Sequence, residues 1–477
     1  MTQEFHPLDA INPIDGRYRD TVSALEPYLS ERALFWYRLK VEVIYFLKLV
    51  KWGIVPADKL SDDNSTMIRH LLGGINLRVY TDRMKQIETT GYEDPENGFK
   101  VPATNHDVKA VEYFLQWYFT KHGMKHLTQW IHFGLTSEDV NNLAYSLMLR
   151  DALENVILPN FEPVIEQIDD FARKFAALPT LARTHGQPAS PTTLGKEFKV
   201  FGARLHKQIC KLKQIKLESK LNGATGNYNA MLVAFPHIDW PKFAAEFIAG
   251  FSRDHTIHLV QNEWTTQIES HDSMIELFDC LRRINMILID LCQDVWRYVS
   301  DGWLKQSVVD GEVGSSTMPH KVNPIDFESA EGNLGLANAL FEFFSRKLPV
   351  SRLQRDLSDS TVQRNIGVAL AYSLIAYKVI FAGLVKISAD EKKITADLNS
   401  HPEVLAEAIQ TILRLEGIAM PYERLKALTR GQKITIETLW DFVQSLQLSP
   451  ELESRLLALR PHNYIGLAAK LAKKTLR

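Results

Sequence analysis

The sequence predicts an all-α protein built on several very long helices. Two observations carry this prediction: apolar residues recur at intervals of three and four over long segments, and convincing alternating strands are scarce. The helical stripe is clear in residues 161–175, and it runs without a Gly or Pro through residues 274–295. It continues through residues 196–220, where Gly202 is the only glycine. We therefore expect a bundle of long central helices.

Breaks between these segments indicate several domains. The chain has 477 residues, which is too long for one ordinary core. Loop signals fall at residues 91–102, 180–191, 222–229, 301–324 and 349–351. Thr136 and Asp139 have the spacing of a reciprocal cap at a helix N-terminus. After about residue 390 the Pro and Gly breaks become frequent, which predicts a small C-terminal helical domain.

Composition excludes some classes of function. The protein is 45% hydrophobic and 23% charged with a net charge of -2, so nothing global favours nucleic acid or an anionic membrane. Its three cysteines form no C-x-x-C pair, and we expect reduced, buried thiols in a cytoplasmic protein. No signal peptide is visible at the N-terminus.

Residues 366–385 are almost continuously apolar and long enough to suggest a membrane span. Lys378 interrupts the segment, and a helix that is apolar all round also suits the buried centre of a large bundle. We expect the buried helix. Because the long helices are more apolar than one monomer requires, we also expect a homo-oligomer with a shared helical core.

Unusual polar clusters lie in the loops rather than on the helical stripes, as in an active site gathered from distant segments. The most unusual is Gly-Ser-Ser-Thr-Met-Pro-His-Lys-Val-Asn-Pro at residues 314–324, a composition that core packing does not require. Others are Asp-Gly-Arg-Tyr at 15–18, Thr-Asn-His-Asp at 104–107, Arg-Thr-His-Gly-Gln-Pro at 183–188 and Thr-Thr-Gln-Ile-Glu at 265–269.

The 314–324 loop closely resembles the signature loop of the fumarase/aspartase superfamily, whose members eliminate fumarate from a substituted succinate. The Ile-Asp-Phe-Glu that follows it, together with the 105–112 and 265–269 segments, resembles the bacterial form of the adenylosuccinate lyase family. The resemblance covers nearly the whole chain, from residue 15 to residue 466.

This resemblance implies a three-domain, all-α, fumarase/aspartase-like fold with domains at 1–125, 126–365 and 366–477. It implies a homotetramer whose active sites draw residues from more than one subunit, with no metal or organic cofactor. The implied substrates are small-molecule nucleotides: adenylosuccinate, which yields AMP, and the succinyl-carboxamide ribotide of purine synthesis. Each releases fumarate.

The resemblance also implies the two catalytic residues. His185 would be the general acid for the leaving nitrogen, and a histidine has a suitable pKa for proton transfer near neutrality. Ser315 would be the base, although chemistry alone would favour a histidine and does not separate Ser315 from Ser316. Without the resemblance, His185 could equally be a surface histidine, and Gly-Ser-Ser could be a flexible linker.

The remaining roles concern substrate binding. By resemblance, Lys321 and Asn323 contact one carboxylate, and Thr136 and Ser137 the other, although helix capping alone would also explain this second pair. His106 and His132 would contact substrate and orient His185. Other implied substrate contacts are Asn105, Asp107 and Gln267. The implied phosphate site comprises Arg17, Tyr18, Arg355, Ser360, Thr361 and Arg364, for which a solvated charged face is the structural alternative.

Three competing interpretations remain. A sister lyase for argininosuccinate or aspartate would not need the phosphate residues, and a non-catalytic relative would not need the reactive residues. A metallohydrolase would need a metal-ligand spacing such as H-E-x-x-H, which this sequence lacks. Two departures from the family pattern stand out: residues 91–103 look like an insertion before Asn105, and Ser270 occupies a position where proline is expected.

Overall fold

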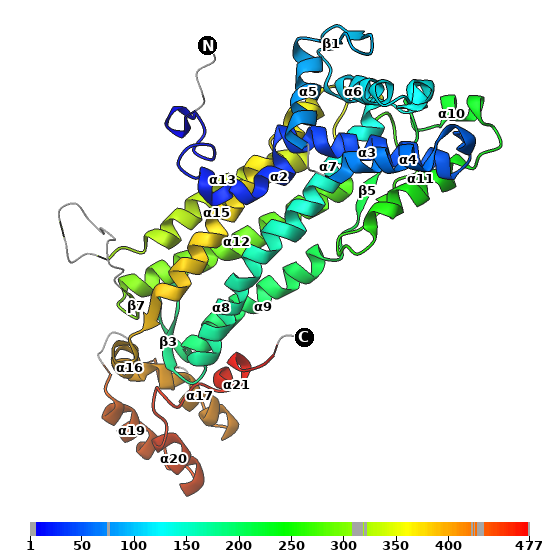
Figure 1. Ribbon diagram of the computed structural model, residues 1–477. Helices are drawn as coiled ribbons and strands as arrows, with labels where there is room; N and C mark the ends of the chain where they lie inside the picture. The colour runs from blue at the N-terminus through cyan, green and yellow to red at the C-terminus, as the bar shows by residue number, and fades with distance from the viewer. Residues whose placement is uncertain are drawn as a thin grey trace. The chain divides into compact units, whose positions relative to one another are not determined.

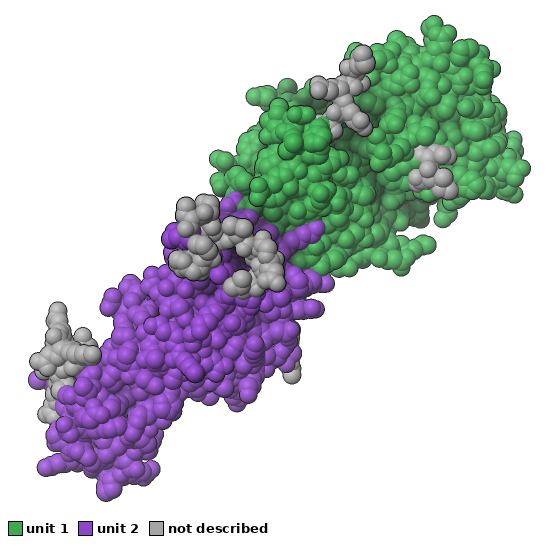
Figure 2. Space-filling model, turned by 60° about the vertical axis from the view of Figure 1, so that its left-hand side comes forward, with its two compact units in different colours: residues 1–160, 209–285, 333–375 green, residues 161–208, 286–332, 376–477 purple. Residues whose placement is uncertain are grey.

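The computed structural model describes residues 6–73, 77–307, 318, 322–420, 423, 425–426 and 434–475. The chain forms two compact units: unit 1 comprises residues 1–160, 209–285 and 333–375, and unit 2 comprises residues 161–208, 286–332 and 376–477 (Figures 1 and 2). The structure is mostly helical, as predicted. The domain boundaries near residues 125 and 365 stay predictions.

Five long helices supply residues to both units. They are α8 (Leu158–Lys174), α9 (Leu194–Leu212), α12 (Asp272–Ser300), α13 (Ile325–Lys347) and α15 (Ile366–Lys386). Helices α8 and α12 confirm the stripes predicted at residues 161–175 and 274–295.

The other elements of unit 1 are mostly helical. Its α-helices are α1 (Arg19–Val22), α2 (Glu26–Leu29), α3 (Glu31–Lys51), α4 (Asp62–His70), α5 (Leu77–Thr89), α6 (Asp107–Lys121), α7 (Ser137–Ala152), α10 (Asn229–Ala234), α11 (Trp240–Ala249) and α14 (Ser358–Gln363). Its 3-10 helices are Pro7–Asp9, Ser23–Leu25, Ala57–Lys59, Leu71–Gly73, Lys125–Trp130 and Gly250–Ser252, and a π-helix spans Leu153–Ile157. Its strands are β1 (Tyr92–Asp94), β2 (Phe99–Val101), β5 (Leu217–Ser219) and β6 (Leu259–Gln261).

The core of unit 1 joins helices that are distant in sequence. Helix α3 begins where the Ser30 side chain accepts a hydrogen bond from the backbone N–H of Ala33. Its buried Phe46 lies edge-on against Phe119 of α6, with 5.1 Å between ring centroids. This packing fixes α6, and with it the start of α6 at Asp107.

The insertion expected at residues 91–103 is an ordered β1–β2 hairpin beside α5 and α6 (Figure 1). The Arg83 guanidinium lies 3.7 Å from the centroid of the Tyr92 ring, a cation–π contact. The Asp94 carboxylate accepts a 2.7 Å hydrogen bond from the indole N–H of Trp117, which holds the pKa of Asp94 below its usual value. These contacts anchor the hairpin to the helices on either side of it.

Unit 2 contains a β-hairpin and a C-terminal group of short helices. Its remaining elements are β3 (Pro179–Thr184), β4 (Gln187–Thr193), β7 (Leu304–Gln306), β8 (Ile387–Ala389), α16 (Glu391–Asn399), the 3-10 helix Pro402–Leu405, α17 (Ala406–Leu415), α19 (Ile436–Ser445), α20 (Pro450–Leu457) and α21 (Ala468–Ala472). The short helices confirm the change of pattern predicted after residue 390.

Two expectations about the segments around α9 were wrong. Residues 180–191 form most of an antiparallel β3–β4 hairpin rather than an open loop. Helix α9 ends at Leu212, not near residue 220, because Leu217 to Ser219 pair in parallel with Leu259 to Gln261. Such a pairing depends on a partner about 40 residues away, which local periodicity does not report.

Close helix packing in unit 2 depends on a glycine. A Cβ on Gly202 of α9 would lie 2.6 Å from the Asp169 carboxylate of α8. That carboxylate accepts a 2.9 Å hydrogen bond from the buried Lys199 ammonium, so no room for a methyl group exists there. Phe171 and Phe198 pack across the same pair of helices, with centroids 4.2 Å apart.

One continuous helical segment, Ser358–Lys386, is long and apolar enough to cross a membrane by length and composition. Of the most apolar 18-residue stretch of this segment, 67% is buried, as expected for a core helix. The cysteine prediction was partly wrong: Cys280 and Cys292 are buried, but Cys210 is exposed.

Candidate functional site

Two of the predicted site residues, Ser315 and Lys321, lie outside the described residues. Asn323, which follows them, is half-buried and lies just before α13. The other predicted residues divide between the units: His185 and Asn323 belong to unit 2, and the rest belong to unit 1.

His185 lies at the tip of the β3–β4 hairpin and is exposed. His185 and Gly186 form a two-residue loop with φ values of 53° and 73°, the geometry of a type I′ turn. Glycine adopts this backbone freely, whereas histidine does so at a cost. The turn fixes the backbone of His185 at the tip of the hairpin, where the imidazole is exposed.

Side chains from elsewhere in unit 2 hold this hairpin. Arg183 donates a 3.3 Å hydrogen bond across the turn to the carbonyl of Gly186, and its guanidinium lies 3.4 Å from the Asp397 carboxylate of α16. On the other strand, Ser190 donates a hydrogen bond to Glu407 of α17. The C-terminal helices therefore support both strands that carry His185.

In unit 1, a buried ion pair organises the start of α7. Thr136 and Asp139 form the predicted capping box, and Asp139 Oδ2 accepts a 2.9 Å hydrogen bond from the Thr136 backbone N–H. Asp139 Oδ1 also lies 2.9 Å from the ammonium of Lys220, and both side chains are fully buried. Lys220 in turn donates to the carbonyls of Gly223 and Gln267, at 2.9 Å each.

The pair thus ties three segments together. It joins Thr136 and Ser137, at the helix N-terminus, to the segment that carries Gln267. A helix N-terminus has free backbone N–H groups and attracts anions, so capping and carboxylate binding are compatible here.

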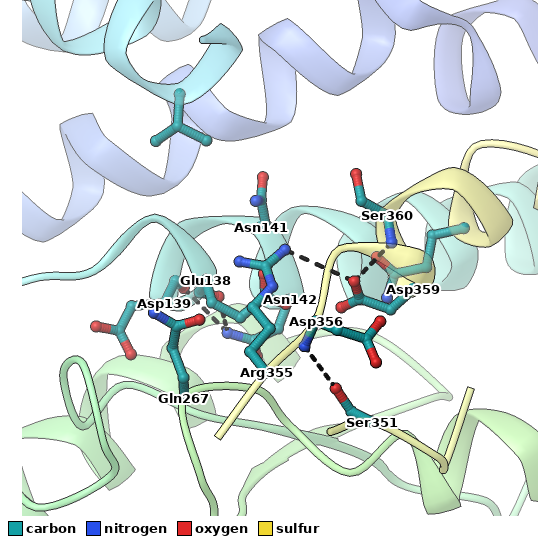
Figure 3. Close-up of polar contacts among 12 residues, drawn as sticks. Glu138, Asp139, Asn141, Asn142, Gln267, Ser351, Arg355, Asp356, Asp359 and Ser360 are labelled. Carbon is teal, nitrogen blue, oxygen red and sulfur yellow. Dashed lines mark hydrogen bonds and ion pairs between the residues drawn. The ribbon is translucent and has the colours of Figure 1, made fainter. Parts of the chain in front are cut away.

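Beside this helix terminus, Arg355 is enclosed by two acidic side chains (Figure 3). Its Nη2 lies 3.2 Å from Glu138 Oε2 and 3.8 Å from Asp359 Oδ1. The side chain of Glu138 is 1% exposed and that of Asp359 is 3% exposed. Burial raises the pKa of the Glu138 carboxyl to about 7, with Arg355 opposing and Asp359 adding to the rise. Ser360 follows Asp359 directly, and its backbone N–H donates to Asp359 Oδ1 at 2.7 Å.

A second arginine is held in a similar way. Asp107 Oδ2 accepts a 2.6 Å hydrogen bond from Arg364 Nη2 and lies 2.8 Å from Arg38 Nη2. Burial would raise the pKa of Asp107, but the two guanidinium groups hold it below its usual value. The Asp107 carboxylate is therefore engaged by arginines, and it positions Arg364, which remains partly exposed.

Two predicted histidines have distinct environments. His132 Nδ1 lies 2.5 Å from the buried Glu42 carboxylate. Burial alone would lower the pKa of His132, but Glu42 raises it above its usual value. His106 caps α6, its Nδ1 accepting a 3.3 Å hydrogen bond from the Lys109 N–H. In neutral His106 the proton then lies on Nε2, which leaves this nitrogen as a donor.

The remaining predicted residues are placed as follows. Arg17 is exposed, with its guanidinium 6.0 Å from the ring centroid of Tyr18. Asn105 and Thr361 are exposed, and Gln267 is half-buried. Unit 1 therefore links Asp107 directly to Arg364, and links Thr136 to Gln267 through the Asp139–Lys220 pair.

Several residues of this network lie beyond what the sequence predicts. Arg38 and Glu42 stand in a largely apolar stretch, and Lys220 is one of several lysines in a mixed polar stretch, so local sequence gives none of the three a distinct role. Glu138 and Asp359 are adjacent to predicted residues, so proximity in sequence was the available signal. His271 is buried with a positive φ, and burial and the Arg355 guanidinium lower its pKa to about 4.

Comparisons with known proteins identify the family of this chain. A family model described as "Lyase" matches residues 16–337, and one described as "Adenylosuccinate lyase C-terminal" matches residues 351–465. The chain is 46% identical to the adenylosuccinate lyase of Legionella pneumophila (strain Philadelphia 1) and 45% identical to that of Escherichia coli K12, covering 98% of each chain in both cases. It is 45% identical to the adenylosuccinate lyase of Dictyostelium discoideum, over 97% of this chain and 98% of that one.

A solved structure supports the fold. The 3-carboxy-cis,cis-muconate lactonizing enzyme of Pseudomonas putida aligns with a TM-score of 0.70 and 19% identity, over 97% of both chains. The likeness at this identity concerns the fold alone. From the family models and the full-length relatives together, the chain is a lyase of the fumarase/aspartase superfamily and belongs to the adenylosuccinate lyase family.

Proposed function

We propose that this enzyme cleaves adenylosuccinate to AMP and fumarate, and the succinyl-carboxamide ribotide to its carboxamide and fumarate, in purine synthesis. The observation that carries the substrate class is the pair of arginines in unit 1. Arg355 and Arg364 are each held by buried or half-buried carboxylates, and the hydroxyl-bearing Ser360 and Thr361 lie between them in sequence. Oriented guanidinium groups beside hydroxyl donors suit a phosphate.

The reaction is a β-elimination. Ser315, as an alkoxide, takes the proton from the carbon beside a substrate carboxylate. The electron pair of that C–H bond forms the C=C bond of fumarate while the C–N bond breaks, and His185 gives a proton to the departing nitrogen. The carbon acid is weak, so cations and N–H donors must stabilise the charge that develops on the carboxylate.

The exposed tip of the β3–β4 hairpin supports the role of His185. A general acid must reach the leaving nitrogen, and a two-residue turn whose strand is held by Arg183 and Asp397 presents an exposed imidazole at the tip of the hairpin. The activation of Ser315 would come from backbone N–H groups of residues 314–316 and from Lys321.

The other contacts follow from their surroundings. Thr136 and Ser137, at the start of α7, would bind one carboxylate of the succinyl group, and Lys321 and Asn323 the other. His106 would donate through Nε2, and His132, made more basic by Glu42, would bind substrate or orient His185. Further substrate contacts would come from Asn105 and Gln267, with Arg17 and Tyr18 completing the phosphate site.

We further propose a cytoplasmic homotetramer with active sites shared between subunits. Large apolar side chains on the long helices support association, because they remain about half exposed in the single chain: Met286 at 52%, Trp296 at 45%, Leu336 at 52% and Phe343 at 44%. A shared helical bundle would cover such faces.

The direct test is an assay of the purified protein with adenylosuccinate that follows AMP and fumarate independently. Release of the two products in equal amounts supports the proposal. A folded protein that releases neither, but releases fumarate from argininosuccinate or aspartate, would instead be a sister lyase.

A further inference from the structure

Glu138 has an unusual position for a carboxylate that faces a substrate-binding arginine. It is 1% exposed, and among the described residues neither of its oxygens makes a hydrogen bond of normal geometry. Its closest cation is the Arg355 guanidinium, 3.2 Å away (Figure 3). Nε of Arg355 is also buried and without a hydrogen-bond partner in the described part of the chain. A buried charge with so few partners is costly unless a cation compensates it.

The charges around Glu138 come from several elements. Arg355 and Asp359 approach from the segment before α14 and from α14 itself, and Lys220 approaches from the segment after β5. Asp139 follows Glu138 on α7, Tyr145 lies two turns further along that helix, and the neutral His271 lies near Arg355. Lys220 is already paired with Asp139, and Asp359 repels Glu138, so Arg355 supplies most of the compensation.

A phosphate dianion bound at Arg355 would compete with Glu138 for the positive charge of the guanidinium. The guanidinium carries one positive charge, which Glu138 and Asp359 already share, and the ligand brings two negative charges into the same neighbourhood. An ionised Glu138 would then lack an adequate counter-charge in a buried place. Neutralisation by a proton is the least costly response for a buried carboxylate.

We propose that Glu138 positions Arg355 and takes up a proton when a nucleotide phosphate binds there. This inference rests on the proposed function, since it requires Arg355 to bind the phosphate. It makes nucleotide affinity depend on pH through a residue that does not contact the reacting atoms. The affinity falls as the pH rises from the pKa of free Glu138 towards its higher pKa in the complex, because binding in this range draws a proton from solution.

Calorimetry with AMP tests the proposal. At about pH 8 the phosphate, whose second pKa is about 6, is already a dianion and releases almost no proton of its own. AMP binding is measured in two buffers of different ionisation enthalpy, which gives the number of protons exchanged. If binding raises the pKa of Glu138 by about one unit, from about 7, the wild-type protein takes up about 0.4 proton per site.

The substitution Glu138→Gln separates this role from a structural one. The neutral amide resembles protonated Glu138, so the variant should take up no proton and bind AMP about fivefold more tightly than wild type at about pH 8. A merely structural role would weaken binding instead. Glu246→Gln is the matched control: Glu246 pairs with Lys48 at 2.9 Å elsewhere in unit 1, and its loss should leave proton uptake at the wild-type value.

A second variant covers the case in which Glu138→Gln does not fold. Asp359 raises the proton affinity of Glu138, so Asp359→Asn should reduce the uptake at about pH 8 and move the fall in affinity to lower pH. Tight AMP binding by wild type without proton uptake, or uptake that persists in Glu138→Gln, overturns the inference while leaving the phosphate site intact. AMP binding that is unchanged in Arg355→Ala overturns the phosphate site as well.

Discussion

Lys220 and Asp139 form an ion pair in which neither side chain is exposed, with 2.9 Å between Nζ and Oδ1. The pair is satisfied by further hydrogen bonds, since Lys220 donates to two carbonyls and Asp139 accepts from backbone N–H groups of Asn222 and Gly223. Complete satisfaction of this kind is what makes a buried charge tolerable. It gives the start of α7 a fixed position relative to two loops of the site.

Removing one member of this ion pair should therefore destabilise the folded protein. Lys220→Met leaves the Asp139 carboxylate buried and unpaired, which should lower the free energy of unfolding by about 3–5 kcal/mol. Urea denaturation followed by circular dichroism, at one protein concentration, measures the change. Lys100→Met is the control, because Lys100 pairs with Glu93 on the surface. This substitution should lower the free energy of unfolding by less than about 1 kcal/mol. Equal costs for the two variants would contradict the account of the buried pair.

Replacing His185 should slow the elimination without disturbing the hairpin. Asn tolerates the left-handed backbone of this position but transfers no proton, so His185→Asn should lower kcat about 100- to 10,000-fold. The exposed His462→Asn serves as the control. Steady-state kinetics with adenylosuccinate decide the matter, and an unchanged kcat would assign the acid to another residue.

Arg364 should act mainly on substrate binding. Arg364→Ala removes a charged donor to the phosphate, worth about 1.5–3 kcal/mol, so KM should rise about 10- to 100-fold with a smaller change in kcat. Arg352→Ala is matched to it, because Arg352 lies in the same part of unit 1 and its side chain is 84% exposed. Similar KM values for the two variants would place the phosphate elsewhere.

The His132–Glu42 pair should contribute stability that depends on pH. Because Glu42 raises the pKa of His132 in the folded protein, the contribution is fully present below the unfolded value of about 6.5 and is lost as the pH rises through the higher folded value. The stability difference between wild type and Glu42→Gln should thus be largest in mildly acidic solution. Denaturation at a series of pH values measures this difference. A difference that grew with pH would mean that the pair does not ionise as described.

The helices were predictable because their signal is local. The apolar stripe at residues 274–295 lies within α12, and the break after residue 390 marks the short helices of the C-terminus. The strands were not predictable in the same way. Residues 217–219 form a strand only because residues 259–261 lie alongside, and the 180–191 hairpin depends on His185 adopting a conformation that histidine rarely takes.

The site shows the same division between local and distant causes. Thr136 and Asp139 have the spacing of a capping box, which a reader of the sequence can recognise. Nothing local marks Lys220 as the partner of Asp139, because the two residues meet only in the folded chain. The backbone carries a further feature that the sequence does not show: Asn105, His132, His185 and His271 are among the nine non-glycine residues of the described chain with positive φ. Such strain persists where surrounding structure enforces it, and it gathers at functional sites.

We propose that this chain eliminates fumarate by proton abstraction at Ser315, and the substitution Ser315→Ala is the decisive variant. The measurement is adenylosuccinate binding by calorimetry alongside fumarate release by the same preparation. We expect near-normal binding, because the phosphate and carboxylate contacts remain, with fumarate release reduced at least about 100-fold. Fumarate release close to the wild-type rate would contradict it and remove Ser315 as the base.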